Sequence, residues 1–165
     1  MNFRAIQRKK NYKEVGVLKM IRKIDIKDKD KYIAMSKKFY HSDAVLQSIP
    51  DNNINKTFDA IISESPYVDG YIFECKGEIV GYSLLSITYS NEAGGLVLWI
   101  EEVYILPEYQ GHGFGKELLS FIEDIYKNKV VRIRLEVEKS NQKAMVLYQK
   151  MGFSELNYMQ MYKKL

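Results

Sequence analysis

The chain has 165 residues, of which 46% are hydrophobic and 28% charged, a composition typical of a globular domain. Its length fits one domain with its own core, and no apolar run reaches the ~20 residues that span a bilayer. The single cysteine, Cys75, excludes an intramolecular disulfide and a cysteine-based metal cluster. Because the basic N-terminus lacks an apolar signal segment, we expect a cytoplasmic protein with no membrane partner.

The net charge of +4 is concentrated in the first 19 residues, which hold six basic side chains and one acidic one. The rest of the chain carries a net charge of −1. We therefore expect residues 1–19 to be a disordered basic leader and residues 20–165 to be a single domain. Nucleic-acid binding would have to depend on the leader alone, so no nucleic-acid partner is expected.

Hydrophobic periodicity and turn residues predict a mixture of strands and helices along the chain. In the first half, the predicted elements are a strand at 20–24, a helix at 29–39, a second short helix capped near Asn55, and strands at 71–75 and 79–89. In the second half, they are a strand at 95–106, a helix at 113–127, a strand at 130–137, a helix from 140 or 141 to 152, and closing strands within 153–162. This mixture indicates the α/β (α+β) class.

A glycine-rich turn, Gln110-Gly111-His112-Gly113-Phe114-Gly115-Lys116, joins a strongly apolar strand to the amphipathic helix at 113–127. Such a turn directs unpaired N–H groups and the positive end of the helix dipole at one place, which suits a phosphate. A nucleotide P-loop is excluded because Glu117 follows Lys116 where a Ser or Thr is needed. A dinucleotide fingerprint is excluded because the loop reads G-x-G-x-G, not G-x-G-x-x-G.

The spacing of Gln110, Gly113 and Gly115 resembles the acetyl-CoA loop of the GNAT-type N-acetyltransferase superfamily. The resemblance continues downstream, where Leu135-Glu136-Val137 is followed by Asn141, Ala144, Leu147-Tyr148 and Gly152-Phe153. It implies a mixed, strongly twisted central sheet whose two middle strands splay apart and hold acetyl-CoA. It also implies transfer of an acetyl group to an amine, with no metal ion.

The resemblance assigns residues to the cofactor. The residues expected to bind acetyl-CoA are Val103, Tyr104, Ile105, Gln110, Gly111, His112, Gly113, Phe114, Gly115, Lys116, Asn141, Ala144 and Tyr148. Lys116 is equally explained as a solvated helix lysine and Asn141 as a helix cap, while His112 is expected to be an exposed loop residue rather than a catalytic one.

Acetyl transfer needs a group that deprotonates the amine and a group that protonates the departing thiolate. Tyr148 is the candidate acid, since a phenol stays protonated at neutral pH, although a core aromatic is the alternative. The candidate bases are Glu102 and Glu136, with a water relay left open. Glu101 and Glu102 are strand neighbours, so only one faces the site unless a bulge intervenes.

The acceptor pocket is expected to come from the first two helices, with Phe39, Tyr40 and Glu101 as substrate-binding residues and His41, Ser42 and Val45 as further candidates. Excess carboxylates there favour a cationic amine. Cys75 ends a hairpin strand far from both motifs, so direct attack of the amine is expected, without an acetyl-enzyme. A non-catalytic acyl-CoA sensor is the alternative function. The sequence is compatible with a homodimer but specifies neither the oligomeric state nor the acceptor.

Overall fold

The computed structural model describes residues 10–14, 17–42, 45 and 48–164. Its elements are β1 (Lys10–Glu14), β2 (Val17–Lys23), η1 (Ile26–Asp28), α1 (Lys29–Phe39), α2 (Asp51–Ile62), β3 (Val68–Cys75), β4 (Glu78–Ser90), β5 (Gly95–Ile105), η2 (Pro107–Tyr109), α3 (Phe114–Tyr126), β6 (Arg132–Leu135) and α4 (Gln142–Lys150). The strands form one sheet in sequence order, antiparallel from β1 to β5, with β6 parallel to β5. The predicted class, a mixed sheet flanked by helices, is confirmed.

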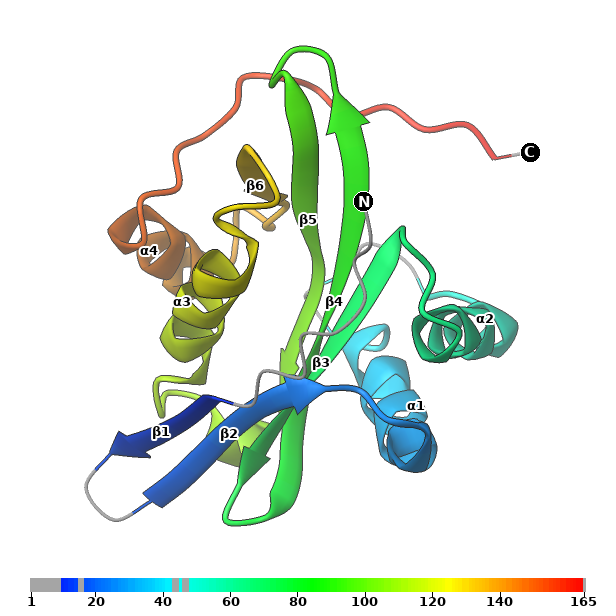
Figure 1. Cartoon of the computed structure of the whole chain (residues 1–165), viewed down its shortest axis with the longest axis vertical. Helices are drawn as coiled ribbons and strands as arrows, with labels where there is room; N and C mark the ends of the chain where they lie inside the picture. The colour runs from blue at the N-terminus through cyan, green and yellow to red at the C-terminus, as the bar shows by residue number, and fades with distance from the viewer. Residues whose placement is uncertain (1–9, 15–16, 43–44, 46–47, 165) are drawn as a thin grey trace.

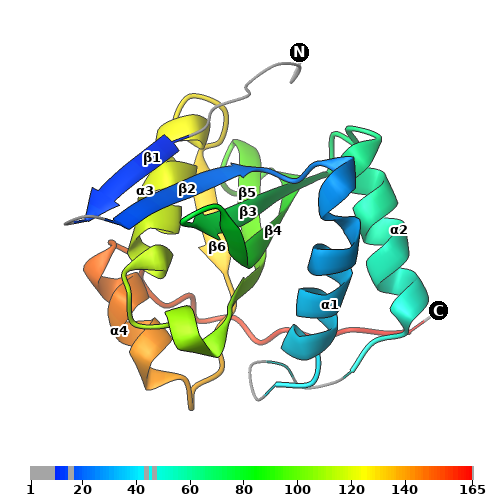
Figure 2. The same ribbon diagram turned by 90° about the horizontal axis from the view of Figure 1, so that it is seen from below.

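The helices cover both faces of the sheet. Figures 1 and 2 show α1 and α2 on one side and α3 and α4 on the other. The apolar stripe of α3 is buried against one face, with Leu118 and Ile122 at its centre. On the other face, Tyr32 and Phe58 pack with Tyr82 of β4. No helix in the described part of the chain is long and apolar enough to cross a bilayer.

The sheet begins earlier in the chain than the sequence indicated. Residues 10–14 and 17–19, assigned to a disordered leader, lie in β1 and β2, and the pairing of β2 with β3 includes Lys19 opposite Cys75. The many basic residues of this segment suggested a disordered leader, whereas pairing with neighbouring strands makes it part of the sheet. The predicted boundary at residue 20 is therefore wrong, while residues 1–9 lie outside the described part.

Two further predictions differ from the structure by more than three residues. Helix α2 starts at Asp51 after Pro50, rather than near Asn55, because proline presets the extended conformation that precedes a helix. The closing strands predicted within 153–162 are not formed: this segment leaves α4 as an extended tail and joins no strand of the sheet. Figure 1 shows the tail in red.

Strands β5 and β6 pair over only four residues and then separate. The pairs run from Val97–Arg132 to Ile100–Leu135, while β5 continues alone on that side to Ile105. This is the predicted splay, but it lies at one edge of the sheet rather than in its middle, because no closing strand follows β6. The splay leaves main-chain groups of β5 without a strand partner next to the start of α3.

Candidate active site

The loop before α3 is shaped by two glycines in the left-handed region. Gly111 has φ of +79° and Gly113, the N-cap of α3, has φ of +83°, values that favour glycine because a Cβ would clash with the backbone. The main-chain N–H groups of residues 111–116 donate to no main-chain acceptor within the described part of the chain. Consecutive free donors at the start of a helix form a cradle for an anion.

Three side chains hold this loop in place. Gln110 donates from Nε2 to the Ile105 carbonyl at 3.0 Å, and His112 Nδ1 lies 2.9 Å from the Gln110 carbonyl. Lys19 is 3% exposed, and its ammonium group donates to the His112 carbonyl and, at 3.1 Å, to Glu117 Oε1. Lys19 was missed because it fell in the segment taken for a leader, and only the fold brings it beneath the loop.

Gly115 allows α4 to pack against α3. A Cβ at this position would lie 2.9 Å from the Leu147 Cδ2 atom, closer than carbon atoms normally approach. The glycine therefore positions α4, and with it Tyr148, beside the start of α3. Of the other predicted cofactor-binding residues at the start of α3, Phe114 is buried in the core and Lys116 is exposed.

Tyr148 is half-buried on α4, where its ring packs 5.8 Å from that of Phe153. Burial raises the pKa of its hydroxyl, so the group is protonated at neutral pH. The side chain also packs against the core on the α3 side of the sheet. Both sequence-based interpretations, an acid and a core aromatic, are compatible with this placement.

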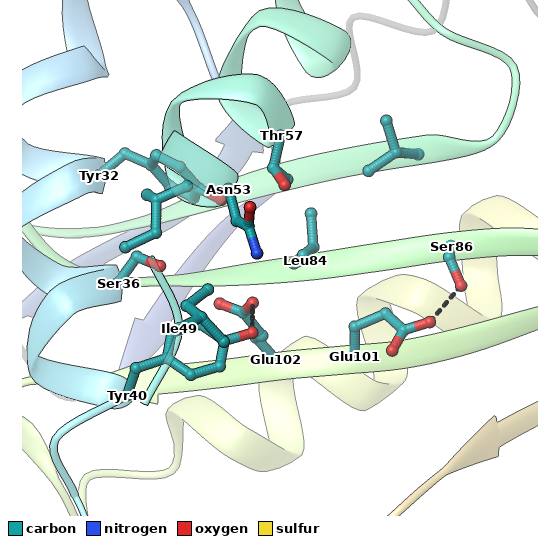
Figure 3. Close-up of a pocket in the computed structure, with 12 residues that line it drawn as sticks. Tyr32, Ser36, Tyr40, Ile49, Asn53, Thr57, Leu84, Ser86, Glu101 and Glu102 are labelled. Carbon is teal, nitrogen blue, oxygen red and sulfur yellow. Dashed lines mark hydrogen bonds between the residues drawn. The ribbon is translucent and has the colours of Figure 1, made fainter. Parts of the chain in front are cut away.

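A pocket of about 390 Å³ opens between α1, α2 and the middle of β4 and β5. The residues that line it are Tyr32, Ser36, Tyr40, Ile49, Asn53, Ile54, Thr57, Val68, Leu84, Ser86, Glu101 and Glu102. Figure 3 shows both carboxylates directed into it. Among these lining residues none is basic, so the pocket carries negative charge.

A β-bulge explains why two adjacent glutamates reach one pocket. Leu84 pairs with Glu102 and Leu85 with Ile100, so Glu101 is an extra residue without an opposite partner. A bulge interrupts the strict alternation of side chains along a strand. Both glutamates therefore face the pocket, which is the exception that the sequence left open.

Glu102 is the buried carboxylate of the pocket, with 6% exposure. Tyr40 donates to its Oε1 at 2.6 Å, and Tyr82 donates to its Oε2 at 2.5 Å. Desolvation by burial raises the pKa of Glu102, while the hydrogen bonds from Tyr40 and Tyr82 lower it without reversing the shift. Such a carboxylate accepts a proton more readily than an exposed one.

The aromatic and polar lining of helix α1 follows a four-residue spacing. Tyr32, Ser36 and Tyr40 lie at positions i, i+4 and i+8, which places them on one face. Asn53 and Thr57 repeat this spacing on α2. The spacing is visible in the sequence, but of these five residues only Tyr40 was predicted to bind the substrate.

The other predicted acceptor residues have different positions. Phe39 is buried and packs edge-on against Tyr40 with ring centroids 5.2 Å apart, so it supports Tyr40 from outside the pocket. His41 is exposed and contacts the Lys37 carbonyl, and Ser42 donates to the Phe39 carbonyl. The pocket lining includes none of Phe39, His41, Ser42 and Val45.

The second candidate base, Glu136, lies away from this pocket. It is exposed just after β6, accepts a hydrogen bond from Gln160, and lines a groove on the α4 side. Asn141 caps α4 through a 3.2 Å bond from the Ala144 N–H, which is the helix-capping interpretation. The described residues contain no group of three or more His, Cys, Asp or Glu side chains suited to a metal ion.

The Acetyltransferase (GNAT) family profile matches residues 36–153, which is well over half of the chain and includes the loop and every pocket-lining residue except Tyr32. The chain belongs to this family. A thialysine N-epsilon-acetyltransferase of Mus musculus is 32% identical over 62% of this chain. A spermine/spermidine N(1)-acetyltransferase of Bacillus subtilis is 31% identical over 47% of it. The matched parts span only 59% and 54% of these relatives' own lengths.

Solved structures share the fold of this GNAT chain. A possible acetyltransferase from Clostridium difficile 630 has a TM-score of 0.75 at 21% identity, covering 89% of this chain and 97% of its own. The aminoglycoside N-acetyltransferase AAC(6')-Iy in complex with CoA has a TM-score of 0.74 at 19% identity, covering 90% and 96%. These likenesses confirm the predicted fold.

Proposed function

We propose that this GNAT-family chain is an acetyl-CoA-dependent N-acetyltransferase that acts on a small cationic amine by direct attack. The observation that supports this most strongly is the buried Glu102, held by two tyrosine hydroxyls in a negatively charged pocket. The edge of β5 that does not pair with β4 becomes free where β6 diverges from it. The proposed base, Glu102, and the main-chain edge proposed to bind acetyl-CoA therefore lie on the same strand, β5.

The chain's residues fit acetyl-CoA. The free N–H groups of residues 111–116 are suited to the pyrophosphate, and a Cβ at Gly111 or Gly113 would disfavour the backbone that presents them. Beyond Ile100, the unpaired side of β5 through Val103, Tyr104 and Ile105 is suited to the amide groups of pantetheine. When bound, acetyl-CoA supplies the thioester that carries the acetyl group.

Glu102 acts as the base in the proposed reaction. An alkyl amine has a pKa near ~10.4, so it enters the pocket mostly as a cation. Glu102 accepts one proton from it, directly or through a water, and the neutral nitrogen forms a bond to the thioester carbon. A main-chain N–H on the open side of β5 stabilises the oxyanion.

Tyr148 acts as the acid when the carbon–sulfur bond breaks. Its hydroxyl is held protonated by burial, and it donates that proton to the departing thiolate. The attacking nitrogen releases its second proton to solvent water, and the Tyr148 phenolate takes a proton back from water. The products are therefore the N-acetylated amine, the CoA thiol and the proton held by Glu102. Cys75 is buried in the core on β3 and lines neither the pocket nor the groove, which supports direct transfer rather than an acetyl-cysteine. The proposed steps require no metal ion.

The lining of the pocket supports a cationic acceptor. Glu101 and Glu102 provide the negative charge, and Ser36, Asn53 and Thr57 provide neutral hydrogen-bonding groups. A volume of about 390 Å³ suits a small molecule or a single side chain. The mouse and Bacillus relatives, named for thialysine and for spermine or spermidine, agree with this class.

The test is release of free CoA from acetyl-CoA in the presence of spermidine, lysine, an aminoglycoside or a peptide with a free N-terminus. We expect release with an amine that carries a second positive charge, and a lower KM than for a monoamine of the same length. The Glu101→Gln variant should reduce that preference. Tight acetyl-CoA binding by calorimetry without release from any amine would instead support the sensor.

A further inference from the structure

The two tyrosines that hold Glu102 differ in their access to the pocket. Tyr82 comes from β4, is 0% exposed and is not among the lining residues, so it covers the Oε2 atom of Glu102 from the core. Tyr40, at the end of α1, is half-buried and lines the pocket. Figure 3 shows its hydroxyl in contact with the Glu102 carboxylate inside the pocket. The Oε1 side of the carboxylate therefore faces the substrate space, with Tyr40 attached to it.

The hydroxyl oxygens of the two tyrosines also differ in their partners. A hydroxyl has one O–H to donate and an oxygen that can accept further hydrogen bonds. Each tyrosine donates its O–H to Glu102, and the Tyr82 hydroxyl is also hydrogen-bonded to Ser36, which is 1% exposed. Within the described part of the chain, the Tyr40 oxygen accepts no hydrogen bond. An acceptor position therefore remains open on Tyr40, at the surface of the pocket.

Glu102 itself offers an amine little direct access. The residue is 6% exposed, and its two carboxylate oxygens already accept from Tyr40 at 2.6 Å and from Tyr82 at 2.5 Å. An ammonium group in the pocket donates more readily to the open acceptor position of Tyr40 than to this covered carboxylate. Because the Tyr40 O–H is already directed at Glu102, a proton that arrives on its oxygen has a path to the base.

We propose that Tyr40 is a further catalytic residue, which relays a proton from the amine to Glu102. This role depends on the function proposed above, and it specifies the side chain through which Glu102 receives the proton. One N–H bond of the ammonium group breaks as its proton binds the Tyr40 oxygen, and the O–H bond of Tyr40 breaks as its proton binds Glu102 Oε1. The amine and Glu102 both become neutral, and Tyr40 is a neutral phenol before and after the step.

The two transfers occur together, because the charged form of Tyr40 is disfavoured. Burial and the negative charge of Glu102 raise the pKa of Tyr40, so its phenolate does not form at neutral pH. The other titratable groups that face this pair are Tyr32 from α1, Tyr82 from β4 and Glu101 from β5. None of these three groups is cationic, so the charge that draws the proton through Tyr40 is that of the carboxylate.

The first experiment compares Tyr40→Phe with Tyr82→Phe, since each removes one hydrogen bond to Glu102 and keeps the ring. Both bonds lower the pKa of Glu102, so both variants should move the rising limb of kcat/KM to higher pH. On the plateau above that limb, Tyr40→Phe should lower kcat/KM for propane-1,3-diamine by ~30–100-fold and Tyr82→Phe by less than ~5-fold. Thermal unfolding checks that both variants fold. Equal losses in the two folded variants would overturn the relay.

The second experiment changes the amine, so it does not depend on the folding of Tyr82→Phe. Fluorine withdraws electrons, so a larger fraction of 2,2-difluoropropane-1,3-diamine than of propane-1,3-diamine is neutral at a given pH. A neutral amine needs no relay, so Tyr40→Phe should lower kcat/KM for the fluorinated amine by only ~3-fold or less. A purely structural role of Tyr40 predicts the same loss with both amines.

The outcomes separate the relay from the proposed function. If the wild type releases CoA and Tyr40→Phe loses the same factor with both amines, the relay is wrong and the proposed function stands. If the wild type releases no CoA with either amine, the relay and the proposed acceptor class are both wrong. A loss confined to propane-1,3-diamine supports the relay.

Discussion

Replacement of Glu102 by glutamine removes the proposed base while keeping the shape of the pocket. The glutamine oxygen can accept from one of the two tyrosine hydroxyls, and its NH₂ group can donate to the other, so both polar contacts persist. Loss of a general base typically lowers a rate by ~10²–10⁴-fold. We expect kcat/KM to fall by ~10²–10³-fold, which corresponds to ~2.7–4 kcal/mol of transition-state stabilisation.

The pH profile of kcat/KM separates this role from a structural one. Glu102 works only when deprotonated, so the wild-type rate should rise with pH through a limb that lies above the ordinary range of a glutamate, because burial raises the pKa. Glu102→Gln should lack this limb. Tyr40→Phe removes a hydrogen bond that lowers the pKa of Glu102, so its limb should move to higher pH.

The assay is CoA release followed with a thiol reagent, alongside thermal unfolding of each variant. Glu101→Gln is the matched control, since this residue lines the same pocket but is exposed. It should keep the limb and change mainly KM. If Glu102→Gln retains the wild-type rate and the same limb, the base lies elsewhere and the reasoning is refuted.

Three further variants test the acid and the loop. Tyr148→Phe should lower kcat by ~10–100-fold with an unchanged CoA affinity by calorimetry, and an unchanged kcat would remove Tyr148 from the mechanism. Gly113→Ala places a Cβ at a φ of +83°, which should cost ~1–2 kcal/mol in unfolding free energy and weaken CoA binding; wild-type values for both would contradict the cradle. Lys19→Met removes the contact to the His112 carbonyl and should raise the KM for acetyl-CoA more than it lowers kcat. The exposed Lys116→Met is its control, and equal effects of the two would show that the buried contact is unimportant.

Local patterns were sufficient for the elements whose stability depends on nearby residues. The bounds 29–39 of α1 were predicted as observed, since the helical stripe that indicates this helix lies within one short window. The α3 stripe and the glycine turn before it were equally readable, because both are set by periodicity and by backbone conformation. The family followed from the spacing of these same residues.

Tertiary structure decided which of the candidate groups meet. Glu102 and Glu136 were equivalent in the sequence, but a bulge in the β4–β5 register turns Glu102 into the pocket while Glu136 lies on the groove. Tyr82 and Lys19 contribute through pairing between distant segments, which no local window contains. Strand register and helix packing are long-range properties, so the sequence alone determined the kind of protein and the fold determined the arrangement of its site.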